Sequence, residues 1–141
     1  MASNGCNPMR WKCKEQDCFN LKQRPKIEIF AECLPGMCAF GDVDAITEIG
    51  GRGLVLEWKS YPMEPWKFQG QRLMWERFTK GAILSAIFIA GDAETMKVSH
   101  LAAFYNGKWH GWQPANLNKL KHHISNWAIW AKANPLLCAH D

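Results

Sequence analysis

The chain has 141 residues, 48% of them hydrophobic and 21% charged, and a net charge of +4. This length and composition are typical of one globular domain with a sizeable core, and they exclude a low-complexity chain. The longest apolar run, residues 82–90, is too short to span a bilayer, and residues 1–20 lack the apolar stretch of a signal peptide. We therefore expect a cytoplasmic protein with no membrane partner, whose six cysteines are mostly reduced.

Two compositional features allow more than one interpretation. Eight tryptophans either fill a small core or lie at a surface that contacts a partner. Basic residues gather near both ends of the chain, where they form either a solvated face or a nucleic-acid contact. The basic positions are Arg10, Lys12, Lys14, Lys22, Arg24 and Lys26, and then Lys119, Lys121, His122 and His123.

The first half of the chain predicts an irregular arm followed by three strands. Residues 1–26 are rich in Gly, Pro, Asn and charge, whereas residues 27–34 are apolar and predict a strand. Residues 39–49 predict a second strand. The sequence Gly-Gly-Arg-Gly at residues 50–53 predicts a tight hairpin, and the apolar residues 54–59 predict a third, central strand.

The second half predicts a helix over residues 68–79, a buried strand over 85–90, and a hairpin of strands 96–105 and 108–112. An apolar stripe then predicts a C-terminal helix that ends near Pro135. This order predicts one α/β (α+β) domain over residues 27–141, with a mixed central β-sheet flanked by helices.

Two acidic residues and a lysine flank the first predicted hairpin. Asp44 and Glu57 lie on adjacent antiparallel strands, and Lys59 shares the face of Glu57 because it follows two residues later. Two carboxylates and the backbone carbonyl of Trp58 suit Mg²⁺, which can polarise a phosphoryl oxygen and activate a water. The alternative is a surface salt-bridge network, worth about 0–1 kcal/mol per pair. The position at the end of an apolar strand favours the functional interpretation, since an unpaired charge there is costly to bury.

Asp44, then twelve residues, then Glu57-Trp58-Lys59 resembles the Asp…Glu-X-Lys pattern of the PD-(D/E)XK nuclease superfamily. Residues 42–60 resemble Holliday-junction resolvases and small phage nucleases in particular. The resemblance implies a restriction-endonuclease-like core in which Asp44 and Glu57 bind Mg²⁺ or Mn²⁺ and Lys59 assists phosphodiester hydrolysis. Gln71 would be the polar catalytic residue on the helix that follows.

Many members of the superfamily also carry an acidic residue on a preceding helix. Here the segment before Asp44 is predicted as extended, so a further metal ligand stays open among Glu28, Glu32 and Asp42.

The function implied by the resemblance is a metal-dependent DNA endonuclease encoded by a phage or prophage and acting in the host cytoplasm. Branched DNA is one candidate substrate, and a homodimer is implied by the resolvase-like members. The alternative is a catalytically silent nuclease-fold protein that binds a host protein or nucleic acid as an inhibitor or adaptor. Phosphate contacts are expected from Lys67, Arg72, Lys80, Arg24 and Lys26.

The cysteines suggest a second metal. Cys13 and Cys18 have the same spacing as Cys33 and Cys38, and the four thiolates would suit a structural Zn²⁺ that tethers the arm. The alternative is that Cys33 and Cys38 are buried small apolar residues. His122 and His123 point in different directions on the predicted C-terminal helix and are expected to be surface residues. His110 is expected either to contact a nucleotide or to belong to an aromatic cluster on an edge strand.

Overall fold

The computed structural model describes residues 25, 27–36, 38, 40–64, 67 and 69–136. The chain divides into two compact units, Met1–Asp42 and Val43–Asp141. The arm predicted for residues 1–26 lies outside the described residues, apart from Pro25.

The first unit contains the short 3-10 helix η1 (Ile27–Cys33), so the strand predicted for residues 27–34 is wrong. Ile29 and Phe30 are 68% and 45% exposed, which means that this apolar run is not buried in a sheet. Phe30 packs edge-on against Phe40, with ring centroids 6.2 Å apart. An apolar run of this length does not by itself distinguish a buried strand from a short helix.

The second unit is built on a five-stranded mixed sheet in the order β1-β2-β3-β4-β5. β2 pairs with β3 in parallel, and the other neighbours are antiparallel. This confirms the predicted mixed sheet and α+β class. The strands are β1 (Ala45–Ile49), β2 (Arg52–Lys59), β3 (Leu84–Asp92), β4 (Lys97–Tyr105) and β5 (Lys108–Pro114).

β1 begins only at Ala45, whereas the predicted strand spanned residues 39–49. The reason lies in the ladder with β2. The Asp44 carboxylate accepts a hydrogen bond from the backbone N–H of Trp58. A longer β1 would have used this donor for a backbone carbonyl, so the side chain of Asp44 ends the strand.

Two-residue turns join two of the three antiparallel pairs, β1–β2 and β4–β5. Gly50 and Gly51, with φ of 60° and 89°, connect β1 to β2 and leave Ile49 opposite Arg52. Asn106 and Gly107, with φ of 51° and 79°, connect β4 to β5. Positive φ at both central positions matches the twist of a hairpin, which explains why Gly and Asn occupy them.

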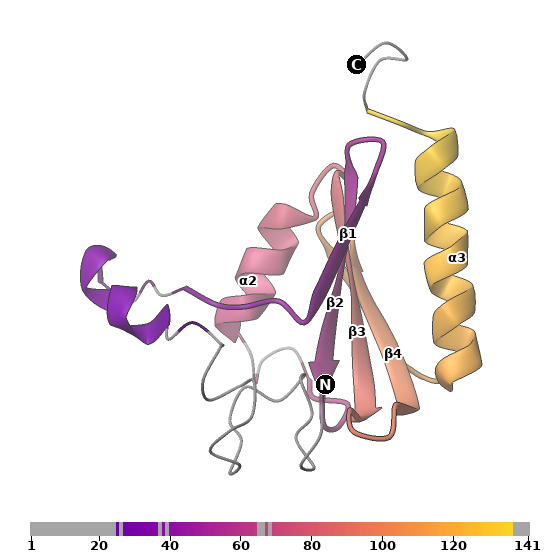
Figure 1. The fold of residues 1–141 in the computed structure, drawn as a ribbon, viewed down its shortest axis with the longest axis horizontal. Coiled ribbons are helices and arrows are strands. Elements are labelled where there is room, and N and C mark those ends of the chain that lie inside the picture. Colours follow the sequence, from indigo (N-terminus) through magenta and orange to yellow (C-terminus); the bar gives the residue numbers. More distant parts are fainter. Residues whose placement is uncertain are drawn as a thin grey trace. The chain divides into compact units, whose positions relative to one another are not determined.

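Two helices cover opposite faces of the sheet (Figure 1). α2 (Gln69–Phe78) makes the crossover that the parallel pair β2–β3 requires. α3 (Leu117–Ala133) follows β5, and the side chain of Asn116 caps it by accepting a hydrogen bond from the N–H of Lys119.

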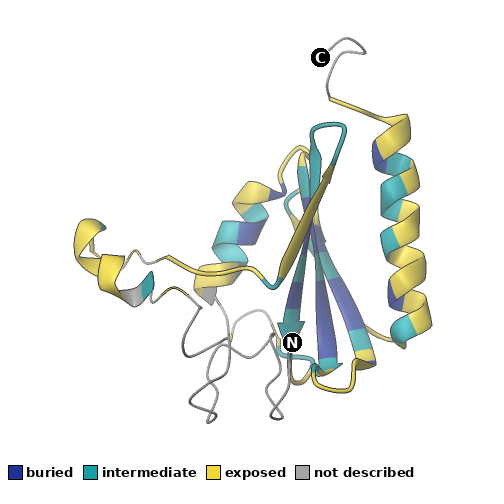
Figure 2. Cartoon of the chain, viewed as in Figure 1, coloured by how far each residue is buried: buried dark blue, intermediate teal, exposed yellow. Residues whose placement is uncertain are grey.

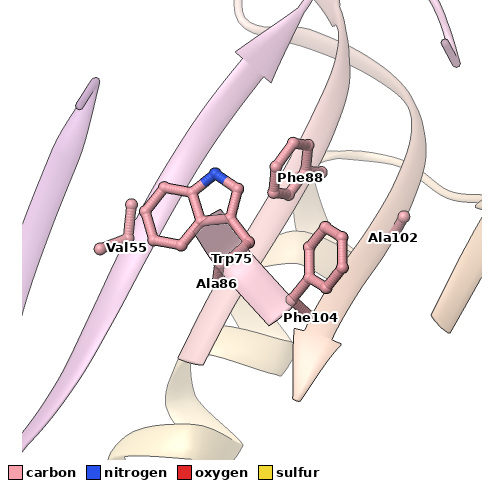
Figure 3. Close-up of a cluster of buried hydrophobic side chains, with 6 residues drawn as sticks. All are labelled: Val55, Trp75, Ala86, Phe88, Ala102 and Phe104. Carbon is pink, nitrogen blue, oxygen red and sulfur yellow. The ribbon is translucent and has the colours of Figure 1, made fainter. Parts of the chain in front are cut away.

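Each face of the sheet has its own hydrophobic core. On the α2 side, Trp75 packs with Val55, Ala86, Phe88 and Phe104, as Figure 3 shows. On the α3 side the buried residues are Ile89, Val98, Leu101 and Leu120. The buried positions therefore run along β2, β3 and β4, while most of α3 is exposed (Figure 2).

Replacing Phe88 by alanine should lower the free energy of unfolding by about 3–5 kcal/mol, because it removes a fully buried ring. Phe78→Ala is the matched control, since this ring is 57% exposed, and should cost less than about 1 kcal/mol. Urea denaturation of both variants measures the difference. Equal losses would contradict the placement of Phe88 at the centre of the core.

Candidate active site

The alternation of side chains along β2 decides which residues reach the site. Val55 belongs to the core on the α2 side, whereas Leu56 and Trp58 pack against the core on the α3 side. Because side chains two residues apart share a face of a strand, Glu57 and Lys59 lie on the α2 side with Val55.

Asp44 joins them from the residue that immediately precedes β1. It stands one residue before the first ladder pair, Ala45 with Leu56. Its Oδ2 accepts a hydrogen bond of 2.6 Å from the N–H of Trp58, and its own backbone N–H hydrogen bonds to the Glu57 carboxylate. These two bonds hold both carboxylates at one point of the hairpin.

Glu57 is a buried carboxylate, only 6% exposed. Its pKa is raised to about 7, first by burial and then by the negative charge of Asp44, while Lys59 and the Asp44 N–H act in the opposite direction. Its Oε1 has no hydrogen-bond partner among the described residues. A buried carboxylate oxygen in this state is available to a cation or to a proton.

Lys59 connects the acidic pair to α2. Its Nζ donates a hydrogen bond of 2.9 Å to Oε1 of Gln71 and lies 5.8 Å from the centre of the Phe88 ring. Burial lowers the pKa of Lys59, and the charges of Glu57 and Asp44 partly oppose that shift. Gln71 is exposed on α2, so the amide fixes the ammonium at the edge of the site.

The end of β2 is anchored on its other face. The indole Nε1 of Trp58 donates to the carbonyl of Gly91 at 3.0 Å. Gly91 lies at an irregularity of the β3–β4 ladder, where a Cβ would collide with the carbonyl of Lys97. The strand that carries Glu57 and Lys59 is thus held on both sides.

Asp44 and Glu57 together are an acceptable ligand pair for Mg²⁺. This ion is commonly held by one or two carboxylates and completes its shell with water and substrate phosphate oxygens. The unpartnered Oε1 of Glu57 supports the fit, since a bound cation would offset the burial and the repulsion by Asp44 that raise the pKa of Glu57. The carbonyl of Trp58 stays a predicted ligand.

A third protein ligand is not described beside this pair within residues 43–64, 67 and 69–136. Among the described residues no three His, Cys, Asp or Glu side chains form a cation-binding group. Asp42 and Glu32 belong to the first unit, and the side chain of Glu28 lies outside the described part of the chain. Their assignment as ligands remains a prediction.

Three of the five residues predicted to contact phosphate lie on or beside α2. Lys67 is exposed, with its Nζ 5.9 Å from the ring centre of Tyr61. Arg72 forms an ion pair of 2.9 Å with Glu76 one turn along the helix. Lys80 is exposed just after the helix. Arg24 and Lys26 lie outside the described residues.

The sequence interpretation did not single out Arg77, an exposed residue in the last turn of α2. Its signal was present in the sequence, because it lies in the predicted helix that carries Gln71 and Arg72. The predicted helix over residues 68–79 thus carries both Arg72 and Arg77, and Lys80 follows it directly.

The predicted zinc site is described only in part. Cys13 and Cys18 lie outside the described residues. Cys33 and Cys38 are exposed, which contradicts the alternative that they are buried apolar residues.

The histidines considered from the sequence, His110, His122 and His123, are exposed. In the described part of the chain, no helix combines the length and apolar character needed to cross a membrane.

The raised pKa of Glu57 makes stability depend on pH. Between about pH 4.5 and 7 the folded chain retains the proton that the unfolded chain releases, so the free energy of unfolding should fall as pH rises. The fall is at most about 3 kcal/mol. Urea denaturation in EDTA at pH 5 to 8 measures it.

Glu57→Gln should remove this fall, because the amide does not titrate. Glu48→Gln, an exposed position on β1, is the control and should retain it. An unchanged pH profile in Glu57→Gln would contradict the raised pKa.

Comparison of the chain with known proteins identified no relative. No protein-family model matches the chain, and neither a curated protein nor a solved structure is significantly similar to it.

Proposed function

We propose that the protein is a metal-dependent endonuclease that hydrolyses DNA phosphodiester bonds. The observation that carries the proposal is the meeting of Asp44, Glu57 and Lys59 on the α2 side of one hairpin, with Lys59 fixed by Gln71. Two acids and an ammonium with these environments suit phosphoryl chemistry better than they suit stability, because burying them is costly.

Asp44 and Glu57 would hold one Mg²⁺ or Mn²⁺. The bound ion would supply a polarised phosphoryl oxygen and a lowered pKa for a water. Glu57 must be ionised to take part, so its raised pKa predicts that metal affinity rises with pH through about 7. The hydrogen bond from Trp58 to Asp44 orients that carboxylate.

Lys59 would stabilise the negative charge that grows on the phosphate as the bond breaks. A half-buried ammonium exerts a stronger field on a nearby phosphate than an exposed one, because less water screens it. Gln71 would be a positioning residue that accepts a hydrogen bond from Lys59 and limits its rotamers.

The substrate backbone would lie along α2. Three exposed basic side chains lie on or next to this helix: Lys67, Arg77 and Lys80. Arg72 is paired with Glu76 and is therefore less available to a phosphate. Contacts of this kind position a nucleic acid without reading its sequence, and they weaken steeply with salt. We therefore propose DNA as the partner, with branched DNA among the candidate substrates.

The proposal is tested by cleavage of supercoiled plasmid and of a four-way junction in Mg²⁺, Mn²⁺ or EDTA. Asp44→Asn and Lys59→Met should each reduce metal-dependent cleavage at least about 100-fold. Asp92→Asn and Lys97→Met, exposed residues at the β3–β4 turn, are matched controls and should cleave like the parent.

If no cleavage is seen, a second measurement distinguishes a site that binds no metal from an active site that lacks its substrate. Mn²⁺ binding, followed by electron paramagnetic resonance, should be lost in Asp44→Asn and retained in Lys59→Met. A folded parent protein that neither cleaves nor binds Mn²⁺ would contradict the nuclease and favour a protein that acts by binding alone.

A further inference from the structure

A cavity of about 450 Å³ lies between α3 and strands β3, β4 and β5. Its wall includes Ser85, Ile87 and Ala103, whose strand positions alternate with the core residues Ala86, Phe88 and Phe104 of the α2 side. It therefore opens on the face of the sheet opposite to the candidate active site. Its volume lies in the range of pockets that bind small molecules, about 300–1,000 Å³.

The cavity exists because the sheet presents small residues where the helix passes. Ser85, Ala103 and Gly111 line it from β3, β4 and β5, and each has a small side chain or none. The helix contributes Lys119, His123 and Trp127, which are spaced by four and therefore share one face.

The chemistry of the wall is divided between interior and rim. Aliphatic residues such as Leu54, Ile87 and Leu101 form the interior. The exposed rim carries Lys119, His123 and His110, and the described residues of the wall include no Asp or Glu. An apolar interior with a basic rim matches a molecule that has an apolar body and an anionic end.

Two polar atoms of the wall residues are buried without a partner. The Oγ of Ser85 and the Nε1 of Trp127 have no hydrogen-bond partner among the described residues. A buried polar group without a hydrogen-bond partner costs about 1–3 kcal/mol, and most such groups in proteins have a partner. Rotation of the Ser85 hydroxyl toward the cavity would let it bond an oxygen of a bound molecule.

We propose that this cavity binds a small amphipathic carboxylate, of the size and chemistry of a medium-chain fatty acid. Its hydrocarbon body lies between α3 and the sheet, and its carboxylate lies at the rim beside Lys119 and His123. The proposal is independent of the nuclease activity, because it uses the other face of the sheet and none of the residues of the acidic pair.

The test uses three probes of defined chemistry: decanoate, hexanoate and decylammonium. Titration of ¹⁵N-labelled protein followed by NMR should move amide signals of β4, β5 and α3 on addition of decanoate. Each methylene removed should weaken binding roughly fourfold, as expected for an apolar interior. Decylammonium, which has the opposite charge, should bind at least tenfold more weakly than decanoate.

Paired substitutions on α3 test the rim. Lys119→Gln combined with His123→Gln should weaken decanoate binding about fivefold, because two hydrogen-bond donors of the rim, one of them an ammonium, are lost. Lys121→Gln combined with His122→Gln removes the same two types of side chain from helix positions that do not contact the cavity and should change the affinity less than twofold.

Two results with the parent protein and one with the variants would overturn the proposal. Absence of shifts in α3, β4 and β5 at millimolar decanoate would do so, as would equal binding of decylammonium. Equal weakening by both double variants would also contradict it, since the rim would then have no special role. The thermal midpoint of each variant without ligand verifies that it is folded.

Discussion

The parallel pairing of β2 with β3 is the constraint on which the rest of the second unit depends. Parallel neighbours cannot be joined by a tight turn, so the chain crosses one face of the sheet through α2. That crossover brings Gln71 to Lys59 and covers the core around Trp75 and Phe88. The other face is left to α3, which covers it less closely and leaves the cavity.

Within this frame the candidate site is electrostatically costly. Glu57 occupies a position on β2 where an apolar residue would continue the core of Val55, and burial together with Asp44 raises its pKa to about 7. Lys59 offsets only part of that penalty, because its own ammonium is partly desolvated. A domain would be more stable with apolar residues here. Retention of such a group is understandable where a cation or substrate completes it.

The sequence predicted most elements of the second unit correctly, whereas one strand that it predicted in the first unit is a 3-10 helix. Apolar runs and the pairs Gly50-Gly51 and Asn106-Gly107 identified the strands from β2 to β5 and the two hairpin turns, because these signals are local. The strand predicted over residues 27–34 was wrong, since no local signal tells whether an apolar run finds a partner strand.

The site shows the same division between local and long-range information. Strand alternation predicted that Glu57 and Lys59 share a face, and they do. Strand alternation could not predict two features: the hydrogen bond from Trp58 to Asp44 that ends β1, and the cavity on the α3 side of the sheet. Both depend on the distance between elements, which the spacing of residues along the chain does not encode.

The central claim is that Asp44 and Glu57 share a divalent cation. The most direct measurement is a crystal structure of the protein soaked in MnCl₂ at pH 8, with anomalous data collected at the manganese edge. The account predicts an anomalous peak in contact with the carboxylates of Asp44 and Glu57, and it predicts that Oε1 is the Glu57 oxygen that binds the ion. Saturating Mn²⁺ that gives no peak at these two residues would contradict it.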